Sequence, residues 1–221
     1  MSKKIDIATH PFFRLLKEGY FNKWEFWYKF KQFRRAVAEW GIVLTNLLVR
    51  ETDSAKREVL ANNLRDELGH GTPSKFHIET FEEFLARCPR FGGSTAQAKK
   101  IDKQGFPNLE KFLETLQQLS SPGSNGVSLD YVYTFLGTIE QLYVQVSQQI
   151  CVCVQIESDE YIPHYTEHSV LDVEHAADLL KLVPPNGDRL LAEMAKNNAT
   201  KLFYKVFDDF LPSSEVKKSG T

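Results

Sequence analysis

The segment YTEHSVLDVEHA, residues 165–176, places three potential metal ligands on one face of a predicted helix. Successive residues of an α-helix are about 100° apart, so His168, Asp172 and His175 fall within an arc of roughly 60°. A solvated helix face with a salt bridge is the alternative interpretation, and the neighbouring Glu167 and Glu174 fit it well. The three aligned side chains favour a metal site, because imidazole and carboxylate groups both bind transition metals.

Two glutamates elsewhere in the chain occupy positions where the core is expected. Glu67 lies three residues after Leu64, on the apolar stripe of its predicted helix. Glu140 is flanked at helical spacing by Leu136 and Tyr143. An unpaired ionised carboxylate costs several kcal/mol to bury, so a buried glutamate normally has a cation, a metal or a proton. A metal site would account for both glutamates.

Histidines add to this pattern. His77 precedes Phe81 by one turn and is predicted to face the core, whereas His70 lies between two glycines in LGHG and is either a turn residue or a ligand. His164 lies one turn before His168 and is interpreted as a supporting or surface residue. A single histidine is more often a satisfied core or surface residue than a ligand. The combined set of three carboxylates and three imidazoles suits a di-iron or di-manganese site inside a helical bundle. Its members are Glu67, His77, Glu140, His168, Asp172 and His175.

The elements that must position these groups are predicted to be helices throughout. Apolar residues recur mainly at helical spacing, so the sequence predicts an all-α fold of seven or eight helices. The expected helices cover about 10–19, 23–50, 53–69, 73–87, 107–120, 127–150, 158–182 and 187–211. Aromatic residues of the second helix are interpreted as core, and 88–106 as a loop. Residues 1–211 are predicted to form one domain, followed by a disordered polar tail, 212–221.

Composition excludes several classes of protein. A formal net charge of -2 over 221 residues gives no broad attraction to nucleic acid or to an anionic membrane. The chain has no signal-peptide core and no apolar run near the ~20 residues of a membrane span, which predicts a soluble, cytoplasmic protein. Cys88, Cys151 and Cys153 are odd in number and lack CxxC spacing. They are predicted to be reduced and mostly buried, with no disulfide framework or structural zinc.

Read together, four segments of the chain resemble the heme-oxygenase-like di-metal oxidases, the group that includes the CADD proteins and the alkene-forming fatty-acid decarboxylases. These segments are HPFFRLLKEGYFNKWEFWYKF (10–30), NLRDELGHG (63–71) with the following His77, GTIEQ (137–141) and YTEHSVLDVEHA (165–176). The resemblance covers nearly the whole chain and is most specific in the last segment.

The resemblance implies an all-α bundle related to heme oxygenase and TenA that holds two ferrous ions, or manganese, reactive toward O2. Glu67, His77, Glu140, His168, Asp172 and His175 then take the ligand roles, and Glu67, Glu140 and Asp172 are the carboxylates at the reacting metals. The alignment leaves open whether His70 or His77 follows Glu67 as the ligand. A homodimer is a further expectation from the family.

One branch of this group makes p-aminobenzoate from its own tyrosine. The corresponding neighbourhoods here carry Ile139, Ile150 and the pair Phe12 and Phe13, which makes that chemistry unlikely for this chain. The predicted activity is therefore O2-dependent oxidation of a small molecule, either a fatty acid or an amino-acid-derived metabolite. Two alternatives stay open: a non-enzymatic metal- or partner-binding module, and a TenA-like hydrolase that needs no cofactor but does need a nucleophilic cysteine at its pocket.

Overall fold

The computed structural model describes residues 6–21, 23–87, 105–123, 126–153 and 163–212. These residues form eight α-helices and no β-strand, which confirms the predicted all-α fold. The helices are α1 (Pro11–Lys17), α2 (Lys23–Arg50), α3 (Ser54–Glu67), α4 (His77–Arg87), α6 (Pro107–Ser120), α7 (Leu129–Cys153), α8 (Pro163–Lys181) and α9 (Arg189–Val206). None of the described helices is long and apolar enough to cross a bilayer.

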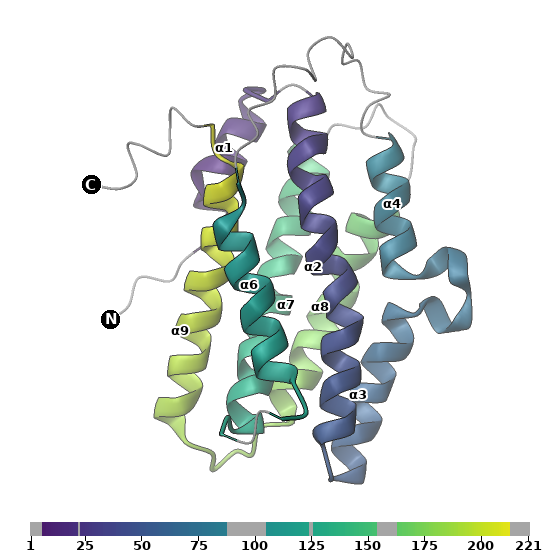
Figure 1. Ribbon diagram of the computed structural model, residues 1–221, viewed down its shortest axis with the longest axis vertical. Helices are drawn as coiled ribbons and strands as arrows, with labels where there is room; N and C mark the ends of the chain where they lie inside the picture. The colour runs from purple at the N-terminus through teal and green to yellow at the C-terminus, as the bar shows by residue number, and fades with distance from the viewer. Residues whose placement is uncertain (1–5, 22, 88–104, 124–125, 154–162, 213–221) are drawn as a thin grey trace.

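The long helices run side by side along the molecule, with α2 in the foreground of Figure 1 and α7 and α8 behind it. Helix α7 packs mainly against α8 and α9, while α2 packs against α3, α4 and α6. The interior between α2 and α7 is therefore enclosed by the other helices. Side chains that point inward from α3, α7 and α8 meet there.

The chain between α3 and α4 differs from the prediction. A continuous helix from residue 73 is wrong, because two 3-10 turns, Gly69–Gly71 and Pro73–Lys75, precede α4. Gly69 has a positive φ of 51°, and a Cβ atom there would lie 2.5 Å from the backbone carbon of Lys75. Only glycine fits this close approach. The break leaves Glu67 at the end of α3 and His77 at the start of α4.

Other helix ends differ from the predicted ones by a few residues. The last helix stops at Val206 and a 3-10 turn, Phe207–Phe210, completes it. Most of the predicted loop, 88–104, and the tail from 213 lie outside the described residues, and the single-domain assignment stays a prediction. Of the cysteines, Cys151 is exposed and Cys153 half-buried, which corrects the expectation that they are buried, and Cys88 is outside the described range.

The aromatic residues of α2 form much of the core, as predicted. Phe26, Phe30 and Phe33 are buried, and Phe30 packs on Phe210 with ring centroids 5.6 Å apart. Trp40, further along the same helix, is only half-buried and lines a pocket. Most of the predicted stripe is thus ordinary core, and its last turns border the candidate site.

Gly137 sets the distance between α7 and α8. A Cβ atom at this position would lie 2.9 Å from the Leu180 side chain and 3.2 Å from the carbonyl oxygen of Ala176. We expect Gly137→Ala to lower the melting temperature by about 2–4 °C, because a methyl group would clash with Leu180 and crowd the Ala176 carbonyl, which costs more than the roughly 1 kcal/mol gained in helix propensity. Gly41→Ala, in α2 where no atom lies within 4 Å, is expected to raise it. Equal increases in both variants, followed by circular dichroism, would contradict the close packing.

Candidate metal centre

All six residues predicted as metal ligands are buried, none more than 6% exposed. They come from four helices: Glu67 ends α3, His77 begins α4, Glu140 lies within α7, and the remaining three lie on α8. The predicted burial of both glutamates is therefore confirmed. Their role in binding metal stays a prediction.

The three ligands predicted on α8 face one another as the helical spacing requires. The Nδ1 atom of His168 lies 2.7 Å from Oδ1 of Asp172, and Nδ1 of His175 lies 3.9 Å from the same oxygen. Glu140 joins them from α7: Glu140, Asp172 and His175 each offer a ligand atom, and these atoms lie within 4.8 Å of one another. Such spacing suits a shared cation.

The other residues continue the same cluster. Nδ1 of His77 lies 2.8 Å from Oε2 of Glu67, and the rings of His77 and His168 are 4.3 Å apart between centroids. Glu67, Glu140 and His168 also line one pocket. The structure therefore brings all six residues into one buried cluster, although they are spread over more than a hundred positions of sequence.

His70 and His77 have clearly different surroundings. The His70 side chain is 66% exposed and pairs with Asp66 at 3.2 Å, away from the cluster. His77 faces Glu67 inside it. The geometry therefore favours His77 as the residue that follows Glu67 in the cluster.

His164 is fully buried, which excludes the surface alternative and leaves that of a supporting residue. It belongs to a chain of hydrogen bonds beside the cluster. Thr80 donates its hydroxyl to the backbone carbonyl of His77, at 3.0 Å. It therefore accepts from Nδ1 of His164, at 3.1 Å, which leaves Nε2 to accept from the Tyr143 hydroxyl at 2.9 Å. Burial and the neighbouring His168 and His77 keep the pKa of His164 well below its ordinary value. The ring is thus neutral and fixes the Tyr143 phenol.

The electrostatics of the cluster show an excess of negative charge. Burial, with added repulsion from Glu67, raises the pKa of Asp172 well above its ordinary value. Burial, Asp172 and Glu67 raise the pKa of Glu140 in the same way. Burial alone would raise the pKa of Glu67, but the pairing with His77 outweighs it and lowers the pKa. Burial lowers the pKa of His168 to about 3, with His77 adding to the effect. Carboxylates this close need a cation to stay ionised.

Several buried ligand atoms have no hydrogen-bond partner within the described part of the chain. Apart from His77 Nδ1, whose nearest charged atom is Oε2 of Glu67, they are Glu67 Oε1, Asp172 Oδ2, His168 Nε2 and His175 Nδ1. Buried polar atoms are nearly always paired, so four unpaired atoms in one cluster require an explanation. Carboxylate oxygens and imidazole nitrogens are the ligands that iron and manganese accept. The residues present therefore fit a metal centre.

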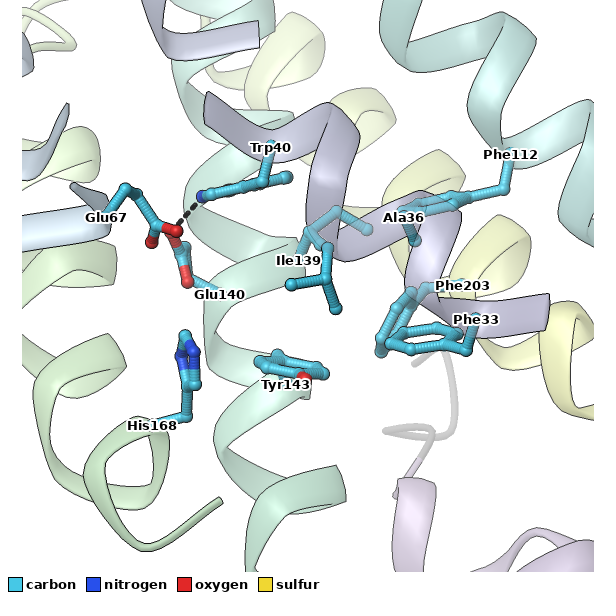
Figure 2. A pocket seen from close by; sticks show the side chains of 11 residues that line it. Phe33, Ala36, Trp40, Glu67, Phe112, Ile139, Glu140, Tyr143, His168 and Phe203 are labelled. Carbon is cyan, nitrogen blue, oxygen red and sulfur yellow. Dashed lines mark hydrogen bonds between the residues drawn. The ribbon is translucent and has the colours of Figure 1, made fainter. Parts of the chain in front are cut away.

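A pocket opens onto this cluster (Figure 2). Its cavity is narrow, about 40 Å³, below the roughly 300–1,000 Å³ of typical small-molecule sites. Glu67, Glu140 and His168 form its polar end, while Phe33, Ala36, Val37, Phe112, Ile139 and Phe203 are apolar. No lysine or arginine lines it among the described residues. The lining, rather than the volume, suits an apolar molecule whose polar group reaches the cluster.

Trp40 has a role that the sequence pattern did not reveal. Its indole Nε1 donates a hydrogen bond to Oε1 of Glu140 at 2.9 Å (Figure 2). The residue looked like core because it continues an aromatic stripe. A buried glutamate on another helix, one hundred positions later, is the partner, and no local spacing signals such a contact.

Fold and cluster together define a helical bundle with a candidate metal centre in its interior. Residues 28–199 match the family described as iron-containing redox enzymes, of the heme oxygenase-like superfamily, and the chain belongs to this family. The matched range contains all six predicted ligands, and it confirms the resemblance found in the sequence. No curated protein matches the chain as a relative.

Proposed function

We propose that this iron-containing redox enzyme is a non-heme di-iron oxidase or oxygenase that uses O2 to oxidise a small organic substrate. The observation that carries the proposal is the buried cluster of six carboxylate and imidazole groups, four of whose atoms lack hydrogen-bond partners among the described residues, at the end of an apolar pocket. Manganese is an alternative metal, because the same ligand types accept it.

In this proposal the side chains hold the metals and shape the surroundings. Glu67, His77, Glu140, His168, Asp172 and His175 would bind the two ions, and Trp40 would hold one oxygen of Glu140 in place. Bound ferrous iron would supply the electrons that reduce O2. The apolar walls keep water from the cluster, which strengthens the electrostatic interactions within it.

The substrate would enter with its apolar part against the phenylalanines of the pocket. The positively charged side chains of α2 nearby are already engaged, since Arg34 pairs with Glu82 and Arg35 with Glu110. A carboxylate or other polar group of the substrate would therefore be bound at the metals rather than by arginine. A fatty acid and an amino-acid-derived metabolite both meet this description.

The hydrolase alternative finds no support among the described residues of the pocket. It requires a nucleophilic cysteine there, but neither Cys151 nor Cys153 lines the pocket. Burial raises the pKa of both thiols, which lowers the fraction of reactive thiolate. The binding-module alternative predicts metal binding without O2 consumption.

The proposal is tested by metal content and O2 consumption of protein purified without oxygen and reconstituted with ferrous iron. We expect about two irons per chain, as a di-iron cluster requires, and rapid O2 uptake. A parallel reconstitution with manganese shows which metal supports turnover. One tightly held zinc, or no metal, with no O2 uptake would contradict the proposal and favour the binding module.

A further inference from the structure

Asp66, the residue before Glu67, lies between two histidines. Its Oδ2 atom is 3.1 Å from Nε2 of His175, and its Oδ1 atom is 3.2 Å from Nε2 of His70. The Asp66 side chain is 25% exposed, while that of His175 is 4% exposed and that of His70 is 66% exposed. The aspartate thus connects a buried residue of the cluster to an exposed histidine, and none of the functions derived above uses it.

The contact with Asp66 determines which nitrogen of His175 carries the proton. An ionised carboxylate only accepts hydrogen bonds, so Nε2 of His175 must donate. Nδ1 is then the unprotonated nitrogen, and its lone pair is free to bind a metal. The same atom is buried, lies 3.9 Å from Asp172 Oδ1 and has no hydrogen-bond partner in the described part of the chain. The orientation of the ring and the position of the proton both suit metal binding through Nδ1.

The loop after α3 brings His70 back to the same aspartate. His70 has a positive φ of 52°, between Gly69 at 51° and Gly71 at 81°. A left-handed backbone at a residue other than glycine costs on the order of 1 kcal/mol. In this conformation the imidazole lies beside Oδ1 of Asp66. The LGHG motif therefore places His70 beside Asp66, on the exposed side of the cluster.

We propose that Asp66 is a positioning residue that fixes the tautomer and ring orientation of His175 for metal binding, and that His70 holds Asp66 from the solvent side. The metal part of this inference rests on the proposed function. Carboxylates that orient metal-binding histidines typically contribute 10- to 100-fold to metal affinity. Asp66→Ala is expected to weaken ferrous iron binding by about that factor.

The tautomer is tested directly on metal-free protein, independently of any activity. Nitrogen NMR of the His175 ring, at mildly alkaline pH where an ordinary imidazole is neutral, is expected to show the proton on Nε2 in the native protein. Asp66→Ala should give a mixture of tautomers, and Asp66→Asn, whose amide oxygen still accepts a hydrogen bond, should retain most of the Nε2–H form. A proton on Nδ1 in the native protein would overturn the inference.

Iron titrations under anaerobic conditions provide the second test. We expect the affinity to fall 10- to 100-fold in Asp66→Ala and less in Asp66→Asn. Asp178→Ala removes an α8 carboxylate that pairs only with Lys181 among the described contacts, at 2.9 Å, and should bind iron normally. A folded Asp66→Ala protein with native tautomer and affinity would refute the positioning role. Absence of iron binding in the native protein would instead contradict the proposed function and leave the NMR result to decide the tautomer.

Discussion

Glu140→Gln is expected to lower iron-dependent O2 consumption by more than about 100-fold and, at the same time, to stabilise the metal-free protein. The loss should exceed the 10- to 100-fold typical of residues that merely support a ligand, because a proposed ligand itself is changed. The amide oxygen of glutamine still accepts the hydrogen bond from Trp40, so the packing of α2 against α7 at this point is kept.

The gain in stability follows from the charges of the cluster. Burial, Asp172 and Glu67 raise the pKa of Glu140, so ionised Glu140 destabilises the folded chain when no metal is present. A neutral amide removes this repulsion and desolvation cost. We expect the melting temperature of the metal-free variant to rise by about 2–4 °C near neutral pH, which corresponds to ~1 kcal/mol for a chain of this size.

The stability difference between the two proteins should depend on pH. Below the ordinary glutamate pKa, Glu140 is protonated in both the folded and the unfolded state, and the variant has no advantage. Above it, the unfolded chain loses the proton while the folded chain retains it, so native stability falls with rising pH until the raised pKa is passed. Melting curves at about pH 5 and pH 8 should therefore show a larger advantage of Glu140→Gln at the higher value.

Glu114→Gln provides the matched control, because Glu114 is an exposed carboxylate on α6. It should change neither iron content, nor O2 uptake, nor melting temperature beyond the small range of surface substitutions. A Glu140→Gln protein that binds two irons and consumes O2 normally would exclude Glu140 as a ligand. A stability gain that does not vary with pH would mean that charge is not its cause.

The parts of the site that could be predicted are those encoded within one helix. His168, Asp172 and His175 follow from helical spacing alone, and a polar residue on an apolar stripe marked Glu67 and Glu140 as buried. The fold class follows in the same way from periodicity over the whole chain. These signals are local, so one sequence is enough to read them.

The parts that could not be predicted depend on contacts between distant segments. Whether His70 or His77 faces Glu67 depends on the two 3-10 turns between α3 and α4, which spacing does not define. The contacts of Trp40 with Glu140 and of Asp66 with His175 join different helices, at separations of 100 and 109 residues. Their partners become visible only when the helices are packed.

Ala36→Phe is expected to lower substrate oxidation on the order of 100-fold while iron binding persists. Ala36 is buried on α2 and lies at the apolar end of the pocket, together with Phe33 and Phe203 (Figure 2). A benzyl group would occupy the space proposed for the substrate, and displacing a substrate by about 1 Å costs on the order of 100-fold in rate. None of the six cluster residues is altered.

The measurement separates a substrate pocket from ordinary core packing. O2 uptake stimulated by a panel of fatty acids and amino acids reports on substrate, and iron content reports on the cluster. Ala38→Phe, the same change on the exposed side of α2, should leave both unchanged. If the cavity is only imperfect packing, Ala36→Phe should change the free energy of unfolding, by about 1–3 kcal/mol where it overfills the core, without changing stimulated uptake. Loss of stimulated O2 uptake at unchanged iron content would show that the substrate lies at the apolar end of the pocket. Substitutions smaller than phenylalanine at Ala36 should then exclude only the longest substrates of the panel.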